Sequence, residues 1–434
     1  MESKKYNIIV VIYLILLLLI IQVAGIVLTY MAIDSVCYSM FLFYFSIVGI
    51  LIYLFYKLSV GIFCIKDFFI IMFFFFSFLS FLFAYDRTIA LFGFFGRREG
   101  LYVLFAYYVF FLVASTLRNE KCLKVFVYVF FVHVFIQILY GSLQVSSLTE
   151  LFGIPIKHKW NYAFGFVGNS NFFSSLQIML LGIALGLFIF DNRYFKIKTI
   201  ILLEISLIGI GLSGAMSGFI SFIMMLILLL VYIIYLVCFK KKKLFYFVYK
   251  IGVLFILFVW TLFILILVFK NKYVLDIFDL NSQTTQIVED GFTDKNGTGR
   301  IHIWKVALKN STKYWVTGIG IDQFFYINDG KIIYDPITGN AIDKAHNEYL
   351  QILLTEGIFK CITYIIFLVW IFFKGIYVII KSNKVEPLLI GLFLSFVGYS
   401  IQAFFNISVT RVAPIFFIIC GLLLGQLEKN RINC

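Results

Sequence analysis

Two residues that could bind and activate a phosphate-containing substrate, Arg300 and His346, lie in a long polar stretch between residues 270 and 347. An arginine presents a planar fork of donors that matches a phosphate, and a histidine can accept a proton near neutral pH. The rest of the chain consists almost entirely of apolar segments, beside which ionisable groups are costly unless they have a function. The pair therefore indicates a site for chemistry on an anionic substrate.

The residues that follow Gly299 predict an amphipathic helix running to about residue 313. At 100° per residue, Arg300 lies on the same face as the apolar residues Ile301, Trp304, Ala307 and Leu308. The opposite face carries His302, Lys305, Lys309 and Lys313. We expect this helix to lie at a membrane interface, with the lysines toward water or lipid phosphates. Arg300 would be the cation turned toward the protein, and the alternative is an arginine that snorkels or pairs locally.

The sequence becomes apolar again directly after His346 and Asn347, so His346 is predicted in the first turn of a membrane helix, at its outer end. The positive end of the helix dipole disfavours imidazolium and keeps such a histidine neutral near pH 7. A neutral histidine beside arginines is suited to accept a proton from a hydroxyl. The alternative is a structural histidine. His133, in mid-membrane, and His302, on the lysine face, are weaker candidates.

A set of cations falls in short loops that we predict on the outer side, against the usual distribution of positive charge. They are Arg87, Arg97, Arg98, Lys157, Lys159 and Arg411. One interpretation is local pairing, of Arg87 with Asp86 and of Arg98 with Glu99. The other is an anionic ligand at the outer leaflet. For Arg97 and Arg98 we favour the ligand, because GFFGRREG (93–100) places them between glycines at a helix start, where free amides and guanidiniums suit phosphate.

The composition predicts an all-α polytopic membrane protein. The chain is 62% hydrophobic and 13% charged, with a mean hydropathy of +1.02, far from the values of a soluble domain. Fifty-five Phe and only four Pro favour membrane helices over a β-barrel. The net charge of +14 is dispersed over loops, so we expect no nucleic-acid partner. The seven cysteines have no close spacing or accompanying His, and we expect neither a metal site nor a disulfide framework.

Apolar runs that approach the ~20 residues needed to cross a bilayer core predict about twelve membrane helices in a single integral membrane domain, residues 1–434. A large loop, residues 270–347, separates the ninth from the tenth, and only Ser213–Met216 separates the seventh from the eighth. The approximate limits are 8–30, 38–56, 68–84, 101–117, 125–145, 172–190, 197–213, 216–238, 248–269, 347–373, 386–403 and 408–426.

The positions of Lys and Arg predict the orientation of these helices. With the N-terminus inside, the inner loops carry most of the 36 Lys and Arg residues, including the run Lys240–Lys243. Most of the others lie in the 270–347 stretch, which is long enough to weaken the rule. We therefore predict that both termini are cytoplasmic and that the 270–347 loop is extracytoplasmic.

Several segments together resemble the signature region of the O-antigen ligase and polymerase-like superfamily. They are GRREGL (96–101), GFVGNSNFFSSLQIMLLGIALG (165–186), GRIHIWKVAL (299–308), GIGIDQF (318–324) and AHNEYLQILLTEGI (345–358). Their order around the long loop carries the resemblance, and Arg300 and His346 match the family's essential Arg and His. In one departure, LSGAMSGF (212–219) lacks the arginine that family ligases commonly carry after the seventh helix, and Arg97, Arg98 or Arg411 would have to replace it.

The resemblance implies a GT-C-like enzyme in the bacterial cytoplasmic membrane that acts at its outer face. Its donor would be an undecaprenyl-pyrophosphate-linked glycan and its acceptor a lipid, a protein or a growing glycan. Neither a nucleotide sugar nor an obligatory metal or other cofactor is implied. Membrane lipids would surround it.

The same resemblance implies roles for the candidate residues. Arg300, with Arg97 or Arg98, would clamp the leaving pyrophosphate, and His346 would orient or deprotonate the acceptor hydroxyl. Attack opposite the leaving group implies inversion at the anomeric carbon. Substrate oxygens would be positioned by Asn169, Asn171, Asn347 and Arg411.

Two other functions fit parts of the sequence. Twelve helices with both termini inside also suit a secondary transporter, but transporters of that plan usually have two similar halves and often a central cytoplasmic connection. Here the large connection is predicted outside, and few ionisable residues occupy predicted membrane centres, the exceptions being His133 and Glu204. The remaining alternative is an inactive structural partner in polysaccharide synthesis.

Overall fold

The computed structural model describes residues 4–31, 35–61, 63–146, 162–191, 197–267, 300–328, 341–382 and 386–432, together with positions 334 and 339. Over these residues every regular element is a helix, apart from one isolated bridge between Tyr334 and Ala341. The predicted all-α class is therefore confirmed. Lys157 and Lys159, and most of the polar stretch before Arg300, lie outside the described residues.

The helices follow the apolar runs of the sequence closely. In chain order they are α1 (Lys4–Met31), α2 (Ser35–Val60), α3 (Ile65–Leu82), α4 (Arg87–Phe92), α5 (Leu101–Ala114), α6 (Glu120–Val145), α8 (Ser170–Phe190), α9 (Ile197–Ser213), α10 (Met216–Cys238), α11 (Leu244–Leu267), α14 (Arg300–Ser311), α15 (Glu348–Glu356), α16 (Ile358–Lys381), α17 (Pro387–Gln402) and α18 (Ala413–Ile432). Short 3-10 turns are η1 (Thr312–Tyr314), η2 (Phe324–Tyr326) and η3 (Ala403–Phe405).

Among the described helices, nine are long and apolar enough to cross a membrane: α1, α2, α3, α6, α8, α10, α11, α16 and α17 with η3. The three other predicted spans correspond to α5, α9 and α18, of 14, 17 and 20 residues. The chain is thus a polytopic membrane protein, while the number twelve stays a prediction.

Helices α8 and α17 form the centre of the bundle, because small residues let their backbones touch. In their most apolar windows, 94% of the α8 residues and 78% of those of α17 with η3 are buried. A Cβ atom added at Gly182 would lie 2.3 Å from the backbone nitrogen of Ser395, and one at Gly186 would lie 2.3 Å from that of Gly391. Membrane helices commonly use such closely spaced small residues to pack.

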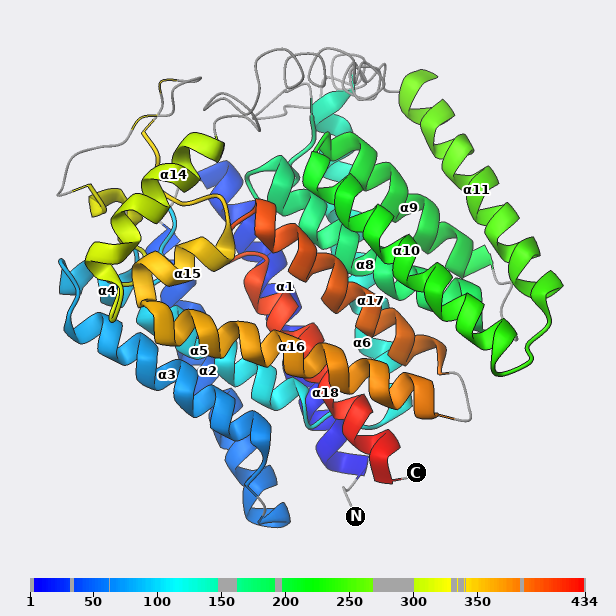
Figure 1. Cartoon of the computed structure of the whole chain (residues 1–434), viewed down its shortest axis with the longest axis horizontal. Coiled ribbons are helices and arrows are strands. Elements are labelled where there is room, and N and C mark those ends of the chain that lie inside the picture. The colour runs from blue at the N-terminus through cyan, green and yellow to red at the C-terminus, as the bar shows by residue number, and fades with distance from the viewer. Residues whose placement is uncertain are drawn as a thin grey trace.

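The two ends of the bundle differ in their charged contacts (Figure 1). At the end that holds both termini, Glu428 of α18 pairs with Lys66, Arg118 and Lys374 at 3.2, 3.3 and 3.7 Å. Asn7 of α1 joins them by accepting the backbone N–H of Arg118. Helices α4, α14 and α15 lie together at the opposite end (Figure 1). Residues predicted on the inside therefore share one end.

The predicted tenth helix, 347–373, is broken in the structure. It forms two helices, α15 and α16, which meet at Gly357. Gly357 has φ of 87°, a left-handed value that favours glycine, and a Cβ atom there would lie 2.1 Å from the carbonyl oxygen of Val316. The apolar run is continuous in sequence, but the turn around Val316 packs into it and requires the break.

We expect cysteines substituted at Asn328 and Lys241 to lie on opposite sides of the membrane, with only the first accessible from outside. Both positions are exposed, and the Lys/Arg distribution predicts opposite sides. The measurement is labelling of intact cells with an impermeant maleimide, in a background without the exposed Cys37 and Cys238. Permeabilised cells provide the control, and labelling at 241 in intact cells would reverse the orientation.

Candidate functional site

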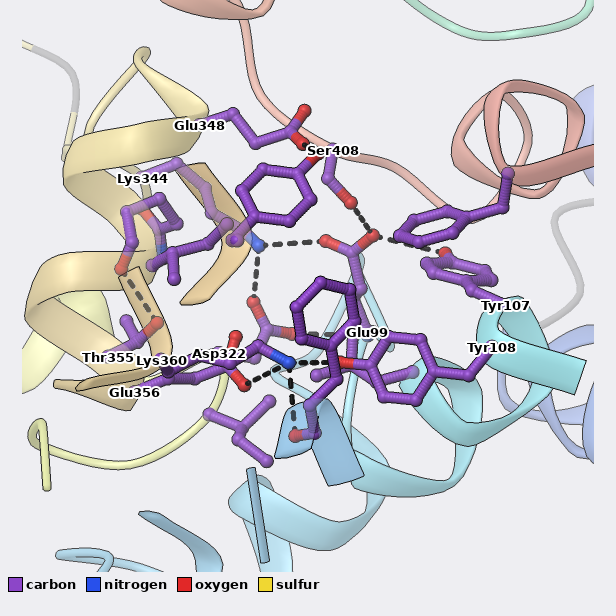
Figure 2. A pocket seen from close by; sticks show the side chains of 17 residues that line it. Glu99, Tyr107, Tyr108, Asp322, Lys344, Glu348, Thr355, Glu356, Lys360 and Ser408 are labelled. Atoms are coloured by element: carbon purple, nitrogen blue, oxygen red, sulfur yellow. Dashed lines mark hydrogen bonds and ion pairs between the residues drawn. The ribbon is translucent and has the colours of Figure 1, made fainter. Parts of the chain in front are cut away.

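A small cavity of about 60 Å³, lined by charged, hydroxyl and apolar side chains, lies beside α15. Its walls come from the turn before α5, the turn before η2, the segments before α15 and α18, and from helices α3, α5, α15, α16 and α18 (Figure 2). The charged and hydroxyl side chains labelled in Figure 2 point toward one another across it. They are Glu99, Tyr107, Tyr108, Asp322, Lys344, Glu348, Thr355, Glu356, Lys360 and Ser408.

Lys344 is the centre of a buried ion cluster. Its ammonium lies 2.8 Å from Asp322 and 3.2 Å from Glu99, and all three residues are at most 5% exposed. Burial alone would lower the pKa of Lys344, but the two carboxylates raise it well above its ordinary value, so the lysine stays charged. Tyr107 and Ser408 donate hydrogen bonds to the other oxygen of Glu99.

Asp322 also organises the turn that contains the predicted arginines. Its second carboxylate oxygen accepts the backbone N–H groups of Phe94 and Glu99 at 2.7 and 3.2 Å. These two bonds span the segment from residue 94 to residue 99, which includes Arg97 and Arg98. The turn is thereby fixed to the loop before η2, more than 200 residues away in sequence.

Arg97 has a carboxylate partner. Its Nε and Nη2 donate to the two oxygens of Asp343 at 2.6 and 3.3 Å, a bidentate pair, and its guanidinium lies 5.9 Å from the ring centroid of Phe172 in α8. Burial would raise the pKa of Asp343, but the hydrogen bonds and charge of Arg97, with smaller effects of Lys344 and His346, hold it below its usual value. Arg97 thus links the start of α8 to the segment containing His346.

His346 lies just before α15, rather than in its first turn as the sequence predicts. Asn347 is the N-cap, and its side chain accepts the backbone N–H of Leu350 at 3.1 Å. His346 itself has φ of 49°, a left-handed conformation that is uncommon outside glycine. It still lies at the positive end of the helix dipole.

Arg300 is the first residue of α14 and is half-buried. Burial lowers its pKa, and no carboxylate among the described residues pairs with it. Trp304 on the same helix donates to the carbonyl of Ala345 at 3.1 Å and packs edge-on against Phe404. α14 therefore joins the segment that carries His346.

The faces of α14 agree with the prediction in part. Ile303 and Ala307 are buried beside Trp304, and Lys305 is exposed. Leu308, predicted on the buried face, is 53% exposed instead. The buried stripe of α14 is therefore narrower than the prediction.

Arg411 is held against the turn before α8. It donates to the carbonyl oxygen of Phe166 at 2.8 Å, and burial lowers its pKa. No carboxylate of the described chain pairs with it. The same turn is bonded to the end of α9, where Ala163 donates to the carbonyl of Leu212 at 2.7 Å.

The asparagines at the start of α8 have structural partners. Asn169 is the N-cap and accepts the backbone N–H of Asn171. Asn171 accepts from Ser217 of α10 at 3.2 Å, and Gln402 of α17 donates to its carbonyl. Asn169 remains exposed. These residues fix the ends of three helices next to Arg411 and Arg97.

The two local ion pairs considered from the sequence, Arg87 with Asp86 and Arg98 with Glu99, are not present in the structure. The carboxylate of Glu99 pairs with Lys344, and the side chain of Asp86 caps α4 through the backbone N–H groups of Thr88 and Ile89. The guanidinium of Arg98 lies 5.5 Å from the ring centroid of Phe95.

A second set of buried polar groups, which was not predicted from the sequence, lies below the ion cluster. Lys360 donates to Tyr108, Ser77 and the carbonyl of Phe73 at 2.6, 3.1 and 3.1 Å. Glu348 accepts from Tyr364 and Tyr399 at 2.6 and 3.3 Å. The available signals were Glu348 in the first turn of the predicted tenth helix, 347–373, and the charged Lys360 in its apolar interior. In the described chain, no group of three or more His, Cys, Asp or Glu side chains could hold a metal ion.

Comparison with known proteins supports the resemblance found in the sequence. Residues 201–368 match a family model described as O-antigen ligase. The match runs from α9 into α16 and includes Arg300, Lys344 and His346, whereas Arg97 and Arg411 lie outside it. No curated protein matches the chain.

Replacing Lys344 by Met should destabilise the protein strongly, because two buried carboxylates would lose their partner. Breaking a buried ion pair typically costs about 3–5 kcal/mol. The measurement is the melting temperature in detergent, with Lys305→Met, an exposed lysine of α14, as the control. An unchanged melting temperature for Lys344→Met would show that the cluster does not hold these segments together.

Proposed function

We propose that this membrane protein, whose residues 201–368 match a family model described as O-antigen ligase, transfers or polymerises an undecaprenyl-pyrophosphate-linked glycan at the outer face of the cytoplasmic membrane. The observation that carries the proposal is that a histidine and several arginines lie on elements packed together at one end of the bundle, away from both termini. α14 contacts the His346 segment through Trp304, and Arg97 links that segment to α8. The acceptor would be a lipid, a protein or another glycan.

In the proposed reaction the arginines neutralise the departing pyrophosphate. Arg300 and Arg411 suit this role best, because both are partly buried and neither has a carboxylate partner among the described residues. Preorganised cations that meet developing negative charge are a common way to lower a barrier without a metal. Arg97 is less suited to bind phosphate directly, since its fork of donors is occupied by Asp343.

The resemblance leads one to expect an arginine after the seventh helix, which this chain lacks. Arg411 lies close to that place. Arg411 is bonded to Phe166, and Ala163 of the same turn is bonded to Leu212, directly before the segment that lacks that arginine. We infer that Arg411 supplies the cation at this place from a different part of the chain.

His346 would act on the acceptor. Its neutral imidazole takes the proton of the acceptor hydroxyl as the oxygen attacks the anomeric carbon, and the bond from that carbon to the pyrophosphate oxygen breaks. One displacement of this kind inverts the anomeric configuration. The amides of Asn169, Asn171 and Asn347 lie at the same end, where their Nδ2 groups would donate to sugar or phosphate oxygens.

Arg300→Lys should lower transfer strongly, because lysine keeps the charge but loses the planar pair of donors. Loss of one preorganised donor typically costs about 10²–10³ in rate. The measurement is transfer from a purified lipid-pyrophosphate glycan. Lys305→Ala, which removes an exposed cation of the same helix, should remain close to wild type. Equal effects of the two changes would mean that α14 is only a basic membrane anchor.

His346→Ala should lower the transfer rate by about 10²–10⁴, the usual contribution of a general base, with expression and donor binding nearly unchanged. Transfer and donor binding are measured separately on the purified protein. The matched control is His302→Ala, which removes a histidine of α14 and should leave the rate intact. Near-normal transfer by His346→Ala would remove this residue from the mechanism.

A further inference from the structure

Four aromatic side chains form a row beside α4, which lies at the end of the bundle opposite both termini (Figure 1). Tyr85, in the turn before α4, stacks on Tyr326 of η2 with the ring centroids 5.1 Å apart. Phe325 of η2 meets Tyr326 edge-on at 5.9 Å and stacks on Phe94, in the turn after α4, at 5.3 Å. Three segments of the chain thus place their rings in one aromatic row.

The aromatic row has exposed ring surface. Tyr85 is 67% exposed, and Phe94, Phe325 and Tyr326 are partly exposed. Tyr85 follows Leu82, the last residue of the predicted span α3, by three residues. The row therefore lies beyond the end of this span, where a polar substrate can reach it.

Hydrogen bonds of the backbone already connect the segments that carry the rings. Tyr85 donates its backbone N–H to the carbonyl of Ile319 at 3.0 Å. The side chain of Gln323 accepts the backbone N–H of Asp86 at 2.9 Å and donates to its carbonyl at 2.6 Å. Because these bonds fix the turn before α4 to the turn before η2, the exposed ring of Tyr85 is not needed to hold the two together.

An alternative role for such rings is an anchor at the membrane interface, where Tyr and Trp are common. An anchor requires only single rings that face lipid. The aromatic row instead has stacked rings from three segments, and the polar side chains of Arg87, Thr88 and Asn328 are exposed within three residues of it in sequence. A sugar ring has a face of C–H groups, which the negative face of an aromatic ring attracts, and hydroxyl groups around its edge.

We propose that the aromatic row is a glycan subsite, on which sugar rings of the lipid-linked substrate stack. The proposal rests on the proposed function for what the bound glycan does, and it names the part of the chain that binds the sugars. The row is next to the reacting groups in the chain, since Phe94 lies three residues before Arg97 and its backbone N–H is bonded to Asp322. A glycan on the row would extend away from the pyrophosphate while the turn before α5 connects the two sites.

The first experiment measures glycan binding without the reaction. The probe is the mixture of oligosaccharides that mild acid releases from the lipid-pyrophosphate glycans of the native cells. Saturation-transfer NMR measures its affinity for the full-length protein in detergent. Tyr85→Leu keeps an apolar side chain but removes the ring, and it should weaken binding about threefold to tenfold, as expected for one stacked ring. Tyr85→Trp should retain the affinity.

The matched control is Trp260→Leu, which removes an exposed ring from the span α11 and should bind the oligosaccharides as the wild type does. Since Tyr85 is mostly exposed, Tyr85→Leu should keep the wild-type melting temperature. Unchanged affinity in Tyr85→Leu, an equal loss in Trp260→Leu, or no binding by the wild type would each overturn the proposal.

Transfer measurements then separate the subsite from the proposed function. With a donor that carries several repeat units, Tyr85→Leu should raise KM about threefold to tenfold and leave kcat nearly unchanged. With a donor that carries a single sugar, the variant and the wild type should differ little. Binding that depends on Tyr85 without transfer by the wild type would retain the subsite and refute the proposed function. Wild-type transfer with an unchanged KM in Tyr85→Leu would do the reverse.

Discussion

The ammonium of Lys344 lies between Glu99 and Asp322 with almost no exposure, and removal of the lysine would leave two carboxylates where water cannot solvate them. These residues come from three separate loops, so the need to pair the charges fixes the loops relative to one another. Arg97 lies two residues before Glu99, and His346 lies two residues after Lys344. The distance between an arginine and the histidine of the site is therefore set by a cluster that need not touch the substrate.

The helices could be predicted from the sequence because a membrane helix depends on a local property, a continuous run of apolar residues. The limits expected for the seventh and eighth spans, 197–213 and 216–238, coincide with α9 and α10, since small residues interrupt the apolar run between them. The break at Gly357 could not be predicted in the same way. A glycine within an apolar run is tolerated in a membrane helix, and only the approach of Val316 from a distant turn shows that this one must bend.

In the candidate site, too, the local turn could be predicted from the sequence, whereas the contacts between residues far apart in the chain could not. GFFGRREG (93–100) does form a turn before a helix, and the sequence located Arg97 and Arg98 there. The partner of Arg97 is 246 residues away in sequence, and no spacing rule connects it to Asp343. Glu99 was considered only as a neighbour for Arg98, because Lys344 reaches it through tertiary structure. Sequence patterns identify which polar groups are unusual, but the choice among possible ion pairs depends on the packed fold.

The charges around His346 are distributed unevenly. The groups tied to its segment comprise three carboxylates, Glu99, Asp322 and Asp343, and two cations, Arg97 and Lys344, which leaves an excess of one negative charge. Arg300 and Arg411, for which no carboxylate partner is found among the described residues, lie on other elements. Glycosyl transfer from a pyrophosphate would create positive charge on the base and negative charge on the leaving group. An acidic segment behind the histidine and unpaired arginines elsewhere in the site would stabilise both at once. We infer that the carboxylates and the arginines have different tasks in one reaction.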